Sequence, residues 1–443
     1  MRMKKIIICS IVVLSFAFAK AQQSKAWSLQ ECVQHALDNN ISIKNGELDT
    51  EVTQVEKRDA LGNFLPSLNL SARRTVSQGF QFNPVSGFEN NKTTNLSGGA
   101  NMGLTIFDGL RSFRQYKRAE LSAEAANYRL QNLKDNVALN VANTYLNVLF
   151  NRENLEVLLK QHDLTNAQIK QTQDLVDAGS LPRGDLLEIQ ATYETENQQI
   201  VAAENSLAIA KLNLAQLLMV QDYENFDVAD MDYLIPTASI LDNTVTHIVD
   251  NAFKNRSEIK IAEQNKKISQ QDVLIARSGY SPTVTGFFNY NTAAQEDTPL
   301  DITDQLYLLD GISYGVSLNI PVFNGFSTRN QVQRAKINLE RSKVAEEQAK
   351  LDLEALVYRS YTDAEGSRIA YNSALKTLEA RKTAFEYSQE RYNVGLLNAF
   401  DFEQTRQLLV NAENQVIQAK YQYIFNLKVL ELYFGVPVSE LKL

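Results

Sequence analysis

The hydrophobic and polar positions of this chain follow two periods, which predict long helices and a few strands. From 130 to 145, apolar side chains recur every three or four residues, as they do on one face of a helix. From 67 to 77, apolar and polar side chains alternate singly, as in a strand with one apolar face. Proline is absent from 110 to 181 and from 322 to 436, so long uninterrupted helices can form there. The chain is therefore predicted to be mainly α with a small β part.

The sequence contains an internal repeat at an offset of 216 residues. A shift by that amount lays the second half on the first without a gap. The matched pairs include Pro66 with Pro282, Phe107 with Phe323, Gly109 with Gly325, Tyr145 with Tyr361, and Gly179 with Gly395. Solenoid repeats are only about 20–50 residues long, so each half is predicted to be a whole module. The modules are residues 22–220 and 243–443, with an acidic connector at 221–242.

The first 21 residues have the pattern of a signal peptide. Three basic residues precede an apolar run from Ile6 to Ala19, and Ala19-Lys20-Ala21 offers a small-x-small cleavage site. The run is shorter than the roughly 20 apolar residues that a membrane-spanning helix needs. Residues 1–21 are therefore expected to direct export from a bacterial cytoplasm. The net charge of -8 and the pI of about 5.2 argue against a nucleic-acid partner, because phosphates require a basic face.

Each half is predicted to contain a helix, two strands, a very long helix and a final helix. The first helix is expected from Ser28 to Gly62, with Ser28 and Glu31 forming a capping box. Its counterpart is expected from Thr244 to Ser278. The strands are expected at about 67–77, 95–107, 283–292 and 312–321, with polar loops at 78–92 and 293–310. The long helices follow Phe107-Asp108-Gly109 and Phe323-Asn324-Gly325, and the final helices start near Asp185 and Asp401.

The four predicted strands have the length and alternation of strands in outer-membrane barrels. Such strands have about 9–11 residues, apolar outward and polar inward. Four strands cannot close a barrel, which has at least about 8, and an open edge in lipid leaves backbone groups unsatisfied. The barrel is therefore predicted to be shared between chains. Two copies would supply about 8 strands and three about 12, and the residues do not choose between these numbers.

In the order of its repeat, strand pairs, Phe-(Asp/Asn)-Gly turns and Gly-x-Leu hairpin tips, the mature chain resembles the TolC-like outer-membrane efflux family. The resemblance implies a homotrimer, whose 12-stranded β-barrel in the outer membrane continues into a 12-helix α-barrel in the periplasm. It also implies a function, the passive exit duct of a tripartite efflux pump for small toxic molecules. Outer-membrane lipid would surround the barrel.

The resemblance further implies two sets of site residues. A periplasmic adaptor protein, and through it an inner-membrane transporter, would dock on the hairpin tips. The tip residues are Gly179, Ser180, Leu181, Gly395, Leu396 and Leu397. The periplasmic gate residues, one turn further, are Asp185, Glu188, Asp401 and Gln404. A trimer would place three copies of each carboxylate around one axis, where they attract cations. Gln404 departs from an acidic pattern, and capping of helix N-termini is an equally good interpretation of Asp185 and Asp401.

The residues that could carry enzyme chemistry form no recognisable constellation. The sequence has no nucleotide-binding glycine loop and no cluster of metal ligands, and its three histidines are dispersed. Cys32 lies in an amphipathic helix without a neighbouring histidine, which favours a structural thiol over a nucleophile. The chain is therefore predicted to be neither an enzyme nor a cofactor-binding protein.

Two other functions are compatible with the same residues. The first is the same architecture serving as the outer-membrane component of a type I secretion system, which exports proteins. The second is a periplasmic coiled-coil scaffold or adhesin that forms no channel and whose strands make a soluble sheet. The scaffold would need no detergent for extraction, so this property separates it from both channel functions.

Overall fold

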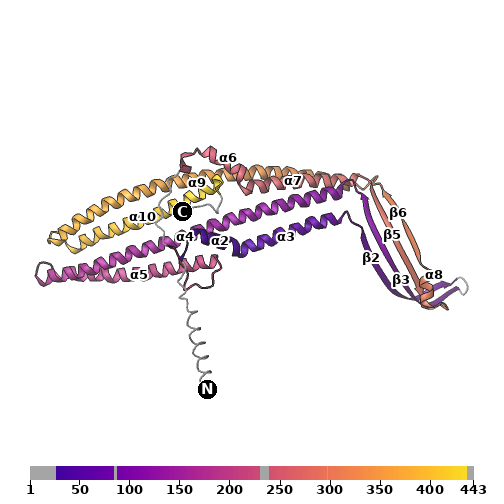
Figure 1. Ribbon diagram of the computed structural model, residues 1–443, viewed down its shortest axis with the longest axis horizontal. Helices are drawn as coiled ribbons and strands as arrows, with labels where there is room; N and C mark the ends of the chain where they lie inside the picture. The colour runs from indigo at the N-terminus through magenta and orange to yellow at the C-terminus, as the bar shows by residue number, and fades with distance from the viewer. Residues whose placement is uncertain (1–25, 84–86, 230–238, 297, 437–443) are drawn as a thin grey trace, which may run out of the picture. The chain divides into compact units, whose positions relative to one another are not determined.

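The computed structural model describes residues 26–83, 87–229, 239–296 and 298–436, and it is mainly helical (Figure 1). Its longest elements are α4 (Arg111–Asp177) and α9 (Ser327–Asn393), each of 67 residues. They are followed by α5 (Arg183–Leu217) and α10 (Ala399–Phe434). The prediction of a mainly α chain with a small β part is confirmed, whereas the predicted signal peptide lies outside the described residues. No described helix is both long enough and apolar enough to span a membrane.

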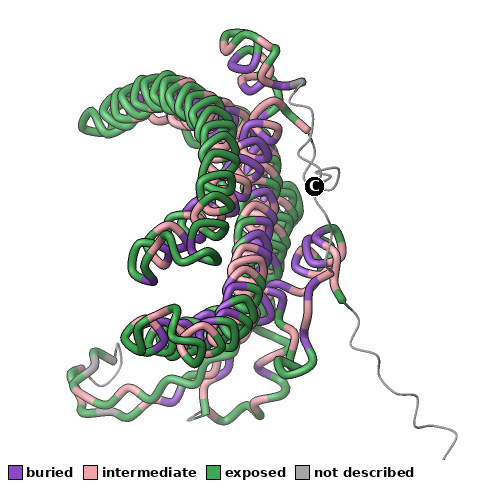
Figure 2. The backbone as a smooth tube through the Cα atoms, turned by 90° about the vertical axis from the view of Figure 1, so that its left-hand side faces the viewer, coloured by how far each residue is buried: buried purple, intermediate pink, exposed green. Residues whose placement is uncertain are grey.

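The chain forms two compact units. The first comprises the residues up to 45, 131–256 and the residues from 351 onward, and the second comprises 46–130 and 257–350. The main core of the first unit lies where α2 (Leu29–Asn39) packs on α4, α5 and α10. Figure 2 shows the buried positions as stripes along the helices, with exposed positions on their remaining faces. This pattern is the one that the three- and four-residue spacing predicted.

The N-terminus of α2 has the predicted capping box. The Glu31 N–H donates to Ser28 Oγ (3.3 Å), and the Ser28 N–H donates to the Glu31 carboxylate (3.0 Å). Cys32 follows on the buried face of this helix with no exposed surface. Burial, together with the negative charge of Glu31, raises the pKa of the Cys32 thiol to about 12. A thiol that stays protonated is a poor nucleophile, so Cys32 acts as a packing residue.

The first helix of each half is not continuous, which corrects the expectation for 28–62 and 244–278. α2 ends at Asn39 and α3 (Ile41–Gly62) begins after Asn40, whose ψ of 131° is extended. The Asn40 side chain accepts a hydrogen bond from the Ser42 N–H (2.9 Å) and donates to the Leu217 carbonyl (3.3 Å). Asparagine favours this capping geometry over a helix interior, because its amide competes for backbone groups.

The second break lies at Arg256, between α6 (Val245–Asn255) and α7 (Ser257–Arg277). Arg256 is buried, and its guanidinium lies 3.2 Å from an Asp135 oxygen and over the ring of Tyr433. These contacts need an extended backbone at Arg256, and hydrophobic periodicity carries no information about them.

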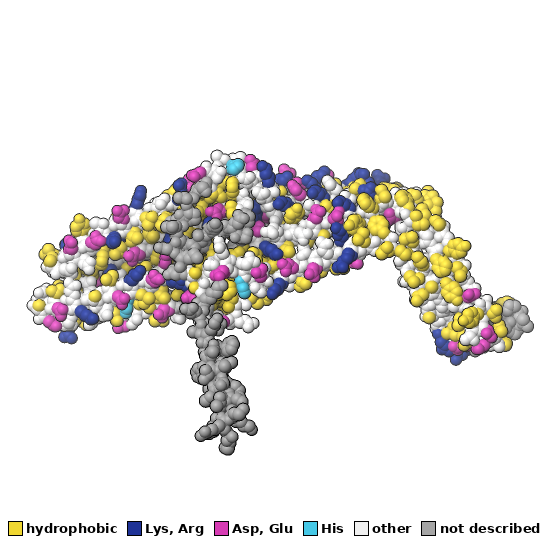
Figure 3. Space-filling model, viewed as in Figure 1, with side chains coloured by type: hydrophobic (Ala, Val, Ile, Leu, Met, Phe, Trp, Pro, Cys, Tyr) yellow, Lys and Arg dark blue, Asp and Glu magenta, His cyan; other side chains and the backbone are white. Residues whose placement is uncertain are grey.

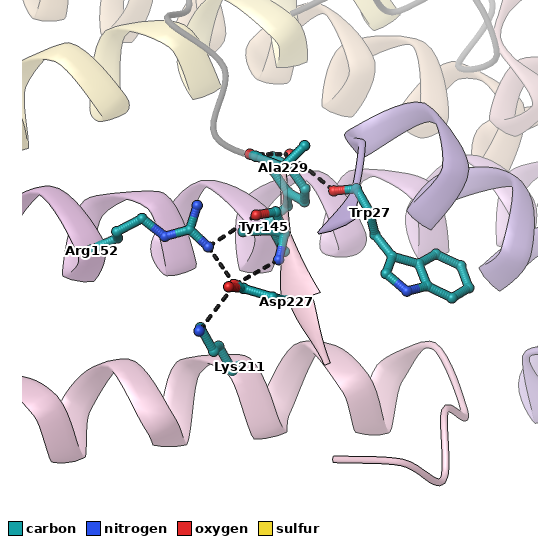
Figure 4. A network of polar contacts seen from close by, with 7 residues as sticks. Trp27, Tyr145, Arg152, Lys211, Asp227 and Ala229 are labelled. Atoms are coloured by element: carbon teal, nitrogen blue, oxygen red, sulfur yellow. Dashed lines mark hydrogen bonds and ion pairs between the residues drawn. The ribbon is translucent and has the colours of Figure 1, made fainter. Parts of the chain in front are cut away.

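The predicted connector at 221–242 begins with an ordered contact to α4 and α5 (Figure 4). Its β4 (Asp227–Val228) pairs in parallel with β1 (Ala26–Trp27), and the 3-10 helix η1 (Ser239–Asp242) follows later. Asp227 accepts hydrogen bonds from Arg152 and Lys211 (3.0 Å to Lys211). Burial opposes the charge on Asp227, but these two cations hold the pKa of its carboxyl below the usual value. The Tyr145 hydroxyl donates to the Trp27 and Ala229 carbonyls, so β1 and β4 are both fixed to α4.

The second unit contains an antiparallel sheet in the order β2-β3-β5-β6. Its strands are β2 (Ser67–Asn83), β3 (Gly87–Phe107), β5 (Thr283–Gln295) and β6 (Gly311–Asn319). The short elements η2 (Ser278–Tyr280) and α8 (Ile302–Leu308) adjoin β5. Large apolar side chains are exposed along the strands, and Figure 3 shows them gathered over the sheet. They include Leu68, Leu70, Ile312, Tyr314, Val316 and Leu318.

The four predicted strands are present in the predicted order and the two-residue strands β1 and β4 were not predicted, while the lengths of β2, β3, β5 and β6 correct two predicted loops. β2 and β3 continue through most of 78–92, because Phe80, Phe82 and Phe88 extend the apolar alternation. The predicted loop at 293–310 contains the end of β5 (293–295) and all of α8. β6 ends at Asn319 rather than 321, since Pro321 has no N–H to donate to a ladder.

Candidate functional site at the helical hairpins

The two hairpin tips of the first unit have the same backbone geometry. Gly179 and Gly395 have φ values of +74° and +73°, in the left-handed region that favours glycine. The Ser180 N–H donates to the Leu175 carbonyl (2.9 Å), and the Leu396 N–H donates to the Arg391 carbonyl (2.8 Å). These bonds over five residues are the Schellman motif, which satisfies the last carbonyls of a helix. Each long helix is therefore stopped by a glycine cap.

The six predicted tip residues do not all face solvent. Ser180 and Leu396 are exposed, and Leu396 keeps 69% of its surface accessible. Leu181 and Leu397 are half-buried and pack against a cluster of buried residues shared by both hairpins. That cluster consists of Ile189, Tyr392, Ala399 and Phe402. In each Gly-x-Leu tip the middle residue is therefore available to a partner, and the leucine anchors the turn.

The four predicted gate residues lie in the first two turns of α5 and α10, with different exposure. Asp185 is half-buried, whereas Glu188, Asp401 and Gln404 are exposed. The Asp401 N–H donates to the Asn398 side chain (2.8 Å), and the Asn398 amide donates to an Asp401 carboxylate oxygen (3.0 Å). Asp401 thus belongs to the N-terminal cap of α10. This contact does not neutralise its charge.

The two hairpins are held together near the tips by polar contacts. Thr172 on α4 and Tyr392 on α9 share a hydrogen bond between their hydroxyls (2.9 Å), and both side chains are fully buried. Gln171 donates to Asn393 (3.1 Å) next to this pair. Burial raises the pKa of Tyr392, although the bond with Thr172 partly opposes the shift. These contacts link segments more than two hundred residues apart in the chain.

Further along α10, Arg406 is the centre of a buried charge cluster. Its guanidinium lies 3.1 Å from a Glu196 oxygen and 2.5 Å from a Glu403 oxygen, and it also bonds the Thr165 hydroxyl. Arg406 and Glu196 keep 4% and 8% of their side-chain surface accessible. One guanidinium therefore faces two carboxylates inside the contact between the hairpins, which leaves one negative charge in excess when both carboxylates are ionised. Such an arrangement is expected to be sensitive to the loss of any member.

His162 borders this charge cluster. The sequence did not reveal the cluster. The Nδ1 of His162 lies 3.8 Å from the second Glu196 oxygen, and the histidine ring stacks on Tyr193. The cluster was missed because charged residues on a long helix are normally solvated. A signal was nevertheless present, since Arg406 lies midway between the buried Phe402 and Val410 at four-residue spacing. A charge at a position of the apolar stripe is unexpected unless a partner is buried with it.

The Glu403 carboxyl makes the contact between the hairpins dependent on pH. Burial and the charge of Glu196 raise the pKa of Glu403 from 4.5 to about 7, although Arg406 opposes this shift. The folded state then retains a proton that the unfolded state loses, so stability falls as pH rises from about 4.5 to 7. The contact is accordingly expected to be stronger in mild acid than at pH 8.

We expect Glu403→Gln to remove this pH dependence. The variant should melt at the same temperature as the wild type near pH 5 and at a higher temperature at pH 8, because it cannot ionise. Thermal unfolding in detergent, followed by circular dichroism at both pH values, measures the difference. Glu386→Gln is the matched control, because Glu386 is exposed, and its melting temperature should change with pH as that of the wild type does. If the melting temperatures of Glu403→Gln and the wild type change equally between the two pH values, Glu403 is not the source of the pH dependence.

Comparison with known proteins gives consistent matches over nearly the whole chain. The family model described as outer membrane efflux protein matches residues 32–218 and 248–436. The chain is similar to the outer membrane protein TolC of Escherichia coli K12, with 23% identity covering 96% of this chain and 85% of TolC. It is also similar to the alkaline protease secretion protein AprF of Pseudomonas aeruginosa, with 21% identity covering 75% and 68% of the two chains. The crystal structure of VceC from Vibrio cholerae superimposes with a TM-score of 0.75 at 16% identity, covering 92% and 96%.

Proposed function

This chain belongs to the outer membrane efflux protein family, and we propose that three copies form the passive exit duct of a tripartite efflux pump for small toxic molecules. The protein resides in the bacterial outer membrane, with its long helices in the periplasm. The observation that carries the proposal is the sheet. It has four strands, an apolar face and two edges that lack a neighbour within the described residues. Such a sheet is satisfied in lipid only when copies close it into a barrel.

The charge and shape of the hairpins support the rest of this function. Three copies would bring Asp185, Glu188 and Asp401 around one axis, and these carboxylates, followed by Gln404, form the proposed gate. The proposed adaptor contact consists of the exposed tip residues Ser180 and Leu396, held by the glycine turns and by Leu181 and Leu397. An adaptor that binds these tips would pull on the hairpins and open the contacts around Tyr392. An inner-membrane transporter would supply the energy.

The mass of the detergent-extracted protein, corrected for bound detergent, tests the duct. Three chains per particle in the outer-membrane fraction are expected. A monomer that is soluble without detergent would overturn the proposal and favour a periplasmic scaffold. Deletion of the gene should then raise the sensitivity of cells to small toxic compounds, with restoration by the intact gene.

Protein export is the second candidate, and one comparison favours it. AprF is by name a secretion protein, and its similarity extends over three quarters of this chain. The two functions predict different losses on deletion. Efflux predicts unchanged secreted proteins with increased drug sensitivity, whereas type I secretion predicts the disappearance of particular proteins from the medium.

We expect Leu396→Asp to reduce efflux on the order of tenfold while leaving the trimer intact. The exposed leucine at the tip would bury its side chain against an adaptor, and an aspartate there would bury a charge. Growth inhibition by an exported compound measures efflux, and mass in detergent measures assembly. Leu396→Met keeps an apolar side chain and should retain function. Full activity of Leu396→Asp would remove this residue from the adaptor contact.

A further inference from the structure

Two apolar surfaces lie at the end of the sheet remote from α3 and α7, and neither is covered within the described residues. The first, the hairpin face, consists of Phe80, Phe82 and Phe88, which are 66–77% exposed. The second, the α8 face, consists of Tyr307, Leu308 and Leu309, which are 57–83% exposed. Exposed clusters of large apolar side chains usually mark a contact surface.

The hairpin face belongs to a two-stranded extension of the sheet. β2 and β3 pair as far as Asn83 and Gly87, whereas the pairing of β3 with β5 ends at Asn95. The three phenylalanines share one side of this extension, and the rings of Phe82 and Phe88 lie 5.3 Å apart. A bidentate ion pair between Arg74 and Glu296 (2.7 and 2.8 Å) bridges β3 below them. The pairing and the alternation of side chains therefore place all three rings on one side of the sheet.

The α8 face is fixed beside β5, where β6 has already ended. The Gln295 N–H donates to the Gln305 side chain (2.8 Å), and the Gln305 amide donates back to the Gln295 carbonyl (3.0 Å). The Thr292 hydroxyl donates to the Leu306 carbonyl. Gln305 is buried, so it anchors α8 along the edge of the sheet. The apolar side chains of α8 remain on the outside of this anchor.

The register of the sheet indicates what would meet the α8 face. β3 pairs with β5 so that Asn101 lies opposite Asn289 and Asn95 opposite Gln295. The offset of 216 relates β2 to β5 and β3 to β6. If β6 of one copy pairs with β2 of the next copy as β3 pairs with β5, the two strands take the same register. Tyr314 on β6 then lies opposite Val76 on β2 of the next copy. This register sets Gly311, the first residue of β6, opposite Gly79, so α8, which precedes β6, would lie beside the part of β2 beyond Gly79.

We propose that the hairpin face of one copy packs on the α8 face of the next copy. The proposal rests on the proposed trimer, and it adds a second contact beyond the strand pairing that would close the barrel. β2 has 17 residues and β6 has 9, so the outer part of β2 finds no strand to pair with on a neighbouring copy. α8 occupies that position instead. The outer part of β2 would thus be covered by apolar packing where no ladder forms.

Disulfide cross-linking between copies tests this contact. In a Cys32→Ala background, Phe82→Cys is combined with Leu308→Cys, and the outer membranes are oxidised before non-reducing electrophoresis. The Cα atoms of a disulfide lie about 4.4–6.8 Å apart, so the bond forms only where the two faces meet. Bands of two and three chains are expected. Ser77→Cys with Leu308→Cys is the control, because Ser77 lies on the opposite face of β2, and it should give monomers.

A third cysteine pair distinguishes the loss of this contact from the loss of the trimer. Val76→Cys with Tyr314→Cys reports the pairing of β2 with β6 and should cross-link in any closed barrel of this register. If this pair cross-links and Phe82 with Leu308 does not, the packing of the two faces is refuted and the duct stands. A cross-link of Phe82 with Leu308 that forms within one chain also refutes the packing. If no pair cross-links and the extracted protein is monomeric, the proposed function falls as well.

Discussion

Replacement of Arg406 by leucine is expected to lower the stability of the contact between the hairpins by about 3–5 kcal/mol, because Glu196 and Glu403 would stay buried without a counter-charge. The leucine would fill much of the space of the arginine stem, so the loss reports the missing charge rather than a large cavity. Every 1.4 kcal/mol is about tenfold in an equilibrium, and the local opening of α10 should become more frequent by about a hundredfold to a few thousandfold.

Amide hydrogen exchange in α10 between Phe402 and Val410 measures this opening. Arg368→Leu is the matched control, since Arg368 is 47% exposed and lies 4.0 Å from a carboxylate oxygen of Glu365, which is itself exposed. Arg368→Leu should change the protection of the α10 amides against exchange by less than about tenfold. Addition of Glu196→Gln and Glu403→Gln to Arg406→Leu should restore much of the protection. If Arg406→Leu exchanges like the wild type, the cluster does not hold the hairpins together.

The second large effect is expected from the charges of the proposed gate. Three carboxylates roughly 6 Å from an axis contribute about 2 kcal/mol of attraction for a monovalent cation in water, before screening. The variant Asp185→Asn/Asp401→Asn should therefore lose cation selectivity by on the order of tenfold in planar bilayers at low salt. Asparagine is the appropriate replacement, because it can still accept the hydrogen bond that Asp401 receives from Asn398.

The reversal potential in a salt gradient measures the selectivity, and thermal unfolding shows whether the caps survive. Asp177→Asn serves as the control, since Asp177 is an exposed carboxylate at the last position of α4. It should leave the selectivity nearly unchanged. A double variant with wild-type selectivity would leave Asp185 and Asp401 only as acidic residues in the first turns of α5 and α10, without affecting the proposal of a duct.

Local sequence signals predicted most elements because each signal acts within a few residues. The glycines at 179 and 395, the Ser28 capping box and the single alternation of the strands all operate over one turn or one strand. The outer parts of β2 and β3 lie in a predicted loop, although Phe80, Phe82 and Phe88 continue the alternation of apolar residues. The surrounding Gln, Asn and Gly residues favour a loop by composition, and the pairing of the two strands outweighs that preference.

The sequence by itself determined the mainly α fold class, the order of the elements and the lengths of the long helices, and it predicted the need for more than one chain. These properties follow from periodicity, from the absence of proline and from the count of strands. Only the tertiary structure decided where helices break, as at Asn40 and Arg256, and which charges are buried, as at Arg406. Those features depend on partners such as Leu217, Asp135 and Glu196, which lie far away in the sequence. Burial arises when two surfaces meet, and no local pattern records which surfaces do so.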